Sequence, residues 1–176
     1  EGALRIGYWG PYEQILISKL LGRFHRTYPN IDLTITQDNN NVLIDQLENE
    51  FIDIVFSSPY PFQVREDINC VILDSSTLCV VVYKNHPLAD EKKISPQRLN
   101  NEKFILLDMQ DPQDYIKLQS DFARNSFKPD IISRPRNYNN LILMVESEIG
   151  ITLLPRCLKQ YTNPDLRFIE LEGDMT

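Results

Sequence analysis

The sequence predicts an α/β protein built from two lobes. Segments with strand and helix periodicity alternate along the first third of the chain, and the same alternation begins again further on. The 176 residues are enough for two compact cores. Strands that alternate with helices in this way favour a mainly parallel sheet with helices on its faces.

The first region is predicted to run strand, helix, strand, helix, strand. We predict a helix over residues 11–28, because proline is favoured at the first helical position and apolar residues follow at helical spacing. A second helix is expected after Asn39–Asn41, whose side chains can cap it. The three strands are expected at residues 4–9, 31–36 and 54–56.

The second region repeats the pattern. Its helices are expected to start at Ser95, at Asp111 and at Asn137. Its strands are expected at residues 78–83, 104–107, 131–132, 151–154 and 166–171. We assign residues 1–76 to lobe I and 77–148 to lobe II, and we expect residues 149–176 to return to lobe I. The hinges are then expected near residues 74–78 and 145–151.

The charge and hydropathy of the chain exclude two classes of protein. The net charge is −7, and the only dense basic spots are Lys92–Lys93 and Arg134–Arg136, so a free-standing nucleic-acid binder is not indicated. The apolar runs are far shorter than the ~18 residues that a membrane span needs. We therefore expect no membrane association, and a cytoplasmic location.

The cysteines and histidines do not form a site for catalysis or metal binding. Cys70, Cys79 and Cys157 are widely spaced and odd in number, which argues against a disulfide framework and fits a reducing cytoplasm. His25 and His86 have no partner at metal-ligand spacing and no acid or nucleophile to orient. We expect no enzyme activity, no metal and no cofactor.

Several short segments are spaced along nearly the whole chain. They are LRIG at residues 4–7, FHRTYP at 24–29, IDLTI at 31–35, IDI at 52–54, HPLA at 86–89 and VESEIGITLLP at 145–155. Each is weak alone, but in this order the segments resemble the effector-binding domain of bacterial LysR-type transcriptional regulators. Glu148 departs from the family pattern, which often has glycine at that position.

This resemblance implies a fold like that of type II periplasmic binding proteins, with two Rossmann-like lobes and a small effector held in the cleft between them. It also implies that a helix-turn-helix domain, absent from this chain, carries DNA binding, and that the effector domain continues beyond Thr176. Effector binding would shift the population of paired domains between states and so change how the regulator holds DNA. Members of the family pair through lobe I, as dimers or tetramers, and residues 11–28 and 41–51 are the candidate interface.

Candidate ligand-binding residues in the first lobe follow the predicted strands. The turn with Trp9, Pro11 and Tyr12 leads into a helix N-terminus, where free N–H groups favour anions, although Pro11 itself offers neither N–H nor hydroxyl. The resemblance places Asn39 and Asn40, and then the Ser57–Ser58 pair, at the effector cleft. Each of these residues also has a structural role that would explain it without a ligand. The aromatic residues could pack at the lobe edge, the asparagines could cap a helix, and the serines could form a chain turn.

In the second lobe, Gln110 and Asp111 follow a buried strand and are expected to face the cleft. The alternative for Asp111 is a helix cap. Arg136 and Asn137 precede the late helix. Arg136 is the best candidate to pair with an anionic effector, since guanidinium binds carboxylate bidentately; the alternative is a solvated surface charge.

Two other functions compete with that of a sensor domain. A secreted solute-binding protein would share the architecture but would need a signal peptide. An enzyme with the same two-lobed fold would need converging acid, base or nucleophilic groups, which the sequence does not offer. The sensor domain is the favoured interpretation because the motifs occur in the family's order.

Overall fold

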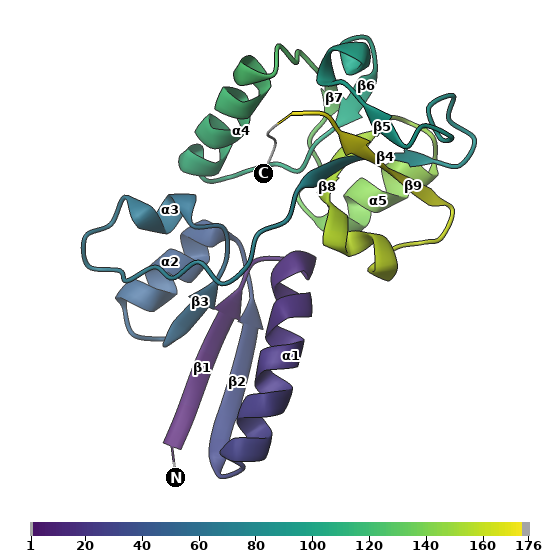
Figure 1. The fold of residues 1–176 in the computed structure, drawn as a ribbon. Coiled ribbons are helices and arrows are strands. Elements are labelled where there is room, and N and C mark those ends of the chain that lie inside the picture. The colour runs from purple at the N-terminus through teal and green to yellow at the C-terminus, as the bar shows by residue number, and fades with distance from the viewer. Residues whose placement is uncertain (1, 174–176) are drawn as a thin grey trace. The chain divides into compact units, whose positions relative to one another are not determined.

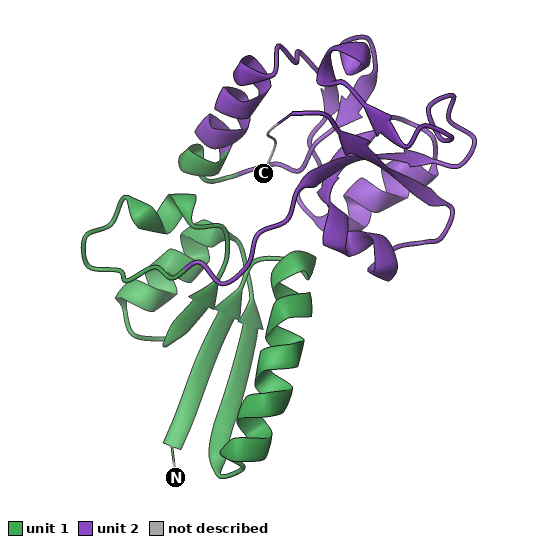
Figure 2. Cartoon of the chain, viewed as in Figure 1, with its two compact units in different colours: residues 1–71, 110–114 green, residues 72–109, 115–176 purple. Residues whose placement is uncertain are grey.

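A computed structural model describes residues 2–173 of the chain. It divides into two compact units that both combine strands with helices (Figures 1 and 2). Unit 1 comprises Glu1–Val71 and Gln110–Asp114, and unit 2 comprises Ile72–Met109 and Tyr115–Thr176.

Unit 1 contains a parallel sheet with the strand order β2-β1-β3. Its strands are β1 (Gly2–Tyr8), β2 (Ile31–Gln37) and β3 (Ile54–Phe56), which confirms the three predicted strands to within about two residues. The connecting helices α1 (Pro11–Thr27) and α2 (Asn40–Glu48) also lie where the sequence predicts them. A short helix, α3 (Tyr60–Gln63), was not predicted.

The core of unit 1 is formed by apolar side chains from the sheet and its helices. Its buried members are Ile6, Ile17, Leu43, Ile44, Ile52 and Phe62. A Cβ at Gly7 would lie 2.7 Å from Leu43 Cδ2, so the absence of a side chain on β1 lets α2 approach the strand closely.

An ion pair fixes the turn before β3 to the first strand. The Arg5 guanidinium reaches Asp53 Oδ1 at 2.6 Å through Nη2 and Asp53 Oδ2 at 3.1 Å through Nε, and the Arg5 backbone N–H donates to Asp53 Oδ2 at 2.8 Å. These hydrogen bonds lower the pKa of Asp53 to about 2. The Asp in the IDI segment therefore has a local structural role in holding β3 beside β1.

Unit 2 is built around a four-stranded sheet with the order β5-β9-β4-β8. Its strands are β4 (Leu78–Tyr83), β5 (Lys93–Ile94), β8 (Thr152–Pro155) and β9 (Leu166–Leu171). β4 pairs antiparallel with both β8 and β9, and β5 pairs in parallel with β9. This sheet is therefore mainly antiparallel, unlike the mainly parallel sheet expected from strand–helix alternation. A separate parallel pair is formed by β6 (Lys103–Ile105) and β7 (Asp130–Ser133).

The helices of unit 2 are α4 (Pro112–Arg124), whose first residues belong to unit 1, and α5 (Tyr138–Glu146). Two 3₁₀ helices, η1 (Pro96–Leu99) and η2 (Arg156–Tyr161), complete the described elements. The core joins buried residues of β4, α4 and β9 with an aromatic cluster in which Phe127 contacts Phe104 and Phe122 edge to face. No helix in the described part is long and apolar enough to cross a membrane.

The path of the chain between the units differs from the predicted one. Residues 149–176 are predicted to return to lobe I, but β8 and β9 pair with both sides of β4 and lie in unit 2. The first crossing falls at Val71 rather than near residues 74–78, and no crossing occurs at 145–151. Instead, Gln110–Asp114 belongs to unit 1. The physical reason is backbone pairing, because the two late strands complete the hydrogen bonds of a fully buried central strand.

Candidate functional site

The loops that follow the three parallel strands of unit 1 lie at one edge of its sheet. The carboxyl ends of parallel strands meet at the same edge, and ligands of α/β folds bind there. The backbone N–H of Trp9 donates to the Phe56 carbonyl at 3.2 Å, and that of Asp38 donates to the Tyr8 carbonyl at 3.2 Å. The turns after β1, β2 and β3 are therefore tied to one another.

Four polar side chains at this edge form a continuous hydrogen-bonded chain. Ser57 Oγ donates to Asn40 Oδ1 at 2.5 Å, and Asn40 Nδ2 donates to Asp114 Oδ2 at 2.9 Å. Ser58 Oγ donates to the other carboxylate oxygen of Asp114. Asn40 is only 4% exposed, so its amide is held in one orientation. We call these four residues, Asn40, Ser57, Ser58 and Asp114, the polar chain.

Glu13 adds a second carboxyl group close to the polar chain. It occupies the third position of α1, and its Oε2 accepts a hydrogen bond from the Gly10 N–H at 3.0 Å. Burial, with the charge of Asp114 as a smaller cause, raises the pKa of Glu13 to about 7, against the effect of its backbone hydrogen bonds. Burial also raises the pKa of Asp114, against the effect of its hydrogen bonds from Ser58 and Asn40. The charge of Asp114 thus disfavours ionisation of Glu13, and the charge of Asp111 disfavours ionisation of Asp114.

The remaining first-lobe candidates divide into capping and wall residues. Asn39 caps α2, because its Oδ1 accepts a hydrogen bond from the Val42 N–H at 3.1 Å. Trp9, Pro11 and Tyr12 are half-buried around the start of α1, with Pro11 at the first helical position. Gln37 Nε2 donates to the Trp9 carbonyl at 3.3 Å, which fixes the backbone of this turn.

The second-lobe candidates are not all in unit 2. Gln110 is exposed and belongs to unit 1 together with Asp111, whose Oδ1 accepts a hydrogen bond from the Gln113 N–H at 2.8 Å at the start of α4. Arg136 is exposed and lies in unit 2 before α5. Asn137 caps that helix, with its Oδ1 accepting from the Asn140 N–H at 2.9 Å. Asp111 and Asn137 therefore act as the caps that the sequence allows.

Sequence reasoning missed Glu13 and Asp114. Glu13 had a detectable signal, since an acidic residue three positions after a helix N-cap is the second half of a capping box. Asp114 had none, because its partners Asn40 and Ser58 are more than fifty residues away in sequence.

His86 has a local structural role, and the three cysteines are not joined to one another. The backbone N–H of Leu88 donates to His86 Nδ1 at 3.2 Å, so His86 stabilises the turn after β4. Cys70, Cys79 and Cys157 are not joined by disulfides. Among residues 2–173, no three His, Cys, Asp or Glu side chains are grouped closely enough to hold a metal ion.

Comparison with known families and curated proteins gives consistent matches. A family model described as LysR substrate binding domain matches residues 1–176. The transcriptional dual regulator GltC of Bacillus subtilis is 25% identical over 167 residues, which are 93% of this chain and 54% of that protein. The transcriptional activator CmpR of Synechocystis is 28% identical over 159 residues, or 89% of this chain and 51% of CmpR. The chain thus spans about half the length of these relatives.

Solved structures match the fold over nearly the whole chain. The effector binding domain of QuiR in complex with shikimate has a TM-score of 0.86 at 20% identity, covering 100% of this chain and 83% of that one. The regulator CbnR has a TM-score of 0.82 at 18% identity, and the match covers 98% of this chain and 59% of the CbnR chain. The BenM effector binding domain with benzoate has a TM-score of 0.75 at 21% identity, and the match covers 98% of this chain and 78% of the BenM chain. These matches confirm the predicted two-lobed α/β fold.

Proposed function

Since this chain belongs to the LysR substrate-binding domain family, we propose that it is the effector-sensing part of a bacterial transcriptional regulator. The relatives that the chain matches include transcriptional regulators about twice its length, such as GltC and CmpR. This supports a regulator over a secreted solute-binding protein or an enzyme. In the whole protein, DNA binding would then reside outside the 176 residues, and the location would be cytoplasmic.

We place the effector at the carboxyl edge of the unit 1 sheet. The observation that carries this placement is the polar chain, in which Asn40 is buried and held between Ser57 and Asp114. A ligand-binding site needs a few polar groups whose directions are fixed before the ligand arrives. Trp9, Pro11 and Tyr12 supply an apolar wall to the same site, with Asn39 and Gln110 as further contacts.

The charge of the site constrains how an anionic effector is held. Glu13 and Asp114 add negative charge to the unit 1 edge when they are ionised, and no basic side chain belongs to the polar chain, so a cation from elsewhere would favour binding of a ligand carboxylate. Arg136 is the proposed source, together with the amide of Asn137 at the start of α5. Small carboxylates are sensible first probes because shikimate and benzoate occupy the QuiR and BenM domains.

Sensing would follow from differential affinity. A ligand shifts a conformational equilibrium only as far as it binds one state more tightly than another. Because Gln110–Asp114 belongs to unit 1 while the rest of α4 belongs to unit 2, a ligand that engages Asp114 or its partners acts on the segment where the chain passes between the units.

The test is a thermal-shift screen of the 176-residue chain against shikimate, benzoate, other small carboxylates and amino acids. A ligand that binds only the folded state raises the melting temperature, by an amount that grows with its concentration over Kd. Hits are then repeated with Arg136→Ala and with Asn40→Ala. Arg23→Ala is the matched control, since Arg23 is an exposed arginine on α1.

Loss of the shift in Arg136→Ala but not in Arg23→Ala supports an anion held by Arg136. Loss in Asn40→Ala alone supports the unit 1 site and removes Arg136 from it. A saturable hit that survives both substitutions contradicts the proposed site while leaving the sensing function in place.

We also propose that the chain associates with a second copy through unit 1, as a dimer or tetramer. Apolar side chains remain exposed there, with Leu20 at 38%, Tyr28 at 53% and Phe51 at 66%. Exposed apolar patches are typical of protein interfaces, and these three residues lie within residues 11–28 and 41–51, the segments that the family resemblance assigns to the interface.

A further inference from the structure

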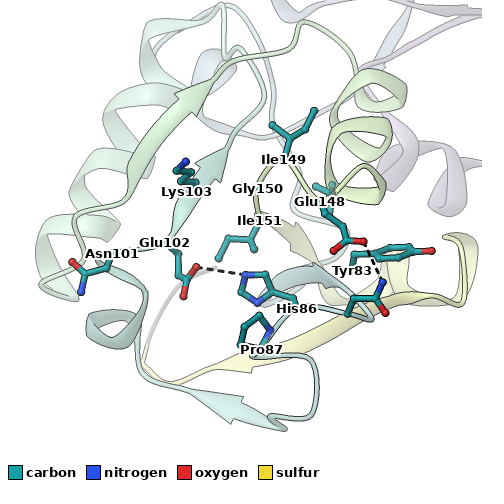
Figure 3. A pocket seen from close by; sticks show the side chains of 12 residues that line it. Tyr83, His86, Pro87, Asn101, Glu102, Lys103, Glu148, Ile149, Gly150 and Ile151 are labelled. Atoms are coloured by element: carbon teal, nitrogen blue, oxygen red, sulfur yellow. Dashed lines mark hydrogen bonds and ion pairs between the residues drawn. The ribbon is translucent and has the colours of Figure 1, made fainter.

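Unit 2 contains a cavity of its own, and none of the residues of the proposed effector site lines it. Its volume is about 320 Å³, and three segments line it: the turn after β4, the residues that lead into β6, and the turn from α5 to β8 (Figure 3). All of its lining residues belong to unit 2. The size lies at the lower end of the range for small-molecule sites.

Two carboxylates at the cavity are held in place by neighbouring side chains. Glu102 Oε2 lies 3.5 Å from His86 Nε2. His86 Nδ1 accepts the Leu88 N–H, so a neutral His86 carries its hydrogen on Nε2, on the side of Glu102. Glu148 Oε1 accepts a hydrogen bond from Asn85 Nδ2 at 3.1 Å. In Figure 3 the Glu102 side chain extends toward the His86 ring, and the Glu148 carboxylate lies on the Tyr83 side of the view.

The position of Glu148 has a conformational cost. Its backbone φ is +59°, in the left-handed region where a side chain costs of the order of 1 kcal/mol relative to glycine. Two residues later, Gly150 has no space for a side chain, because a Cβ there would lie 2.6 Å from the Lys103 carbonyl oxygen. The close contact at Gly150 therefore restricts the backbone beside the cavity. Glu148 occupies a backbone conformation that glycine would adopt without strain.

The charges of the cavity define the ligand that fits it. Two carboxylates line it together with the basic side chain of Lys103. The Asn85 amide holds one oxygen of Glu148, and the His86 imidazole lies beside one oxygen of Glu102. An anion is disfavoured here. A coordinated metal ion is also disfavoured, since the described residues include no group of three suitable ligands.

We propose that this unit 2 cavity is a second binding site, for a small organic molecule that carries an ammonium group. An ammonium offers three N–H donors and forms charge-assisted hydrogen bonds with carboxylates, which matches an acceptor pair provided by Glu102 and Glu148. His86 and Asn85 act as positioning residues that orient the two carboxylates. The site is independent of the polar chain in unit 1.

The experiment is calorimetric titration of the 176-residue chain with putrescine, a four-carbon diamine. Succinate has the same chain length with opposite charge, and 1,4-butanediol is the neutral counterpart. The variants are Glu102→Gln and Glu148→Gly. Glu66→Gln is the control, because Glu66 is exposed in unit 1 and its substitution changes the net charge equally.

Saturable one-to-one binding of putrescine is expected, with no heat from succinate or butanediol. Each cavity variant should raise the Kd about tenfold or more, because it removes an ionised hydrogen-bond acceptor, whereas Glu66→Gln should leave it within about twofold. Glu148→Gly relieves the backbone strain, so this variant should melt no lower than the parent chain. A loss of putrescine binding in Glu148→Gly would then not be caused by unfolding.

Three results overturn the proposal: no saturable binding of putrescine, equal weakening by Glu66→Gln, or equal affinity for succinate. The second would mean that the diamine responds only to the net charge of −7. Binding that survives both cavity substitutions but is lost in Asn40→Ala would place the amine in unit 1 instead, and would also overturn it.

Discussion

Asp114, in the first turn of α4, accepts a hydrogen bond from Asn40, at the start of α2, across 2.9 Å and 74 positions of sequence. This contact brings the start of α4 into unit 1. The carboxylate also accepts a hydrogen bond from Ser58, so one side chain joins two of the three strand-end loops.

Substitution of Asn40 by alanine should destabilise the protein by about 1–3 kcal/mol. The change leaves the partly buried Ser57 hydroxyl without its acceptor and removes one of the two side-chain hydrogen bonds that Asp114 accepts, and an unsatisfied buried polar group costs this much. Urea denaturation followed by circular dichroism measures the loss. Asn41→Ala is the control, because Asn41 is exposed on the same helix and should change stability by less than about 0.5 kcal/mol. Equal effects of the two substitutions would mean that the polar chain contributes nothing to stability.

Glu13 should make stability fall as the pH rises from about 4.5 to about 7. Burial raises its pKa from 4.5 to about 7 in the folded protein, so the folded state binds this proton more tightly than the unfolded state. The contribution is complete below pH 4.5 and is lost as the pH passes through 7, with a total of the order of 3 kcal/mol. The raised pKa of Asp114 acts in the same direction.

Unfolding free energies of the parent chain and of Glu13→Gln, measured at pH 5 and pH 8, test this. The glutamine keeps an acceptor for the Gly10 N–H but cannot ionise, so the difference between the two pH values should become smaller. An unchanged pH dependence in Glu13→Gln would show that other groups cause it.

Gly150→Ala should lower the melting temperature, whereas Gly22→Ala should raise it. A Cβ at Gly150 meets the Lys103 carbonyl at 2.6 Å and forces apart backbone that is joined by the hydrogen bond from Ile151 N to Lys103 O. Gly22 lies within α1, and a Cβ added there would lie 3.7 Å from Arg26 Nη1, which is an ordinary van der Waals contact. Alanine should therefore stabilise the helix by about 0.5–1 kcal/mol relative to glycine. Differential scanning fluorimetry compares them, and a stabilised Gly150→Ala would refute the close approach.

Leu20→Lys should weaken self-association without lowering the melting temperature of the monomer. The side chain is 38% exposed on α1, so a charge there is tolerated in the free chain but is costly in an apolar interface. Sedimentation velocity over a concentration series measures the self-association of the parent chain and of the variant. Ile116→Lys, at a position 58% exposed on α4, adds the same charge outside the candidate interface and should leave association unchanged. If both substitutions act equally, unit 1 is not the specific interface.

Local signals in the sequence were sufficient for most elements. The apolar spacing predicts α1, and the asparagines at positions 39 and 137 cap α2 and α5 as expected. These features depend on residues within three or four positions of one another, where periodicity and capping rules apply. The turn at His86 is predictable for the same reason.

Long-range pairing was not predictable in the same way. Strand propensity does not say which neighbour a strand selects, so the antiparallel pairing of β8 and β9 with β4 had no local signature. The site shows the same division. Asn40, Ser57 and Ser58 could be named from the loops that hold them, but Asp114 is brought to them by the tertiary fold.

The central place of β4 has a consequence for synthesis on the ribosome. Both edges of this apolar strand stay unpaired until residues 152–171, about seventy positions later, have left the exit tunnel. The β1–β3 sheet, by contrast, is complete once Phe56 has emerged. The nascent chain should therefore form the first sheet early and expose Leu78–Tyr83 meanwhile, which makes that strand the segment most in need of chaperone protection during translation.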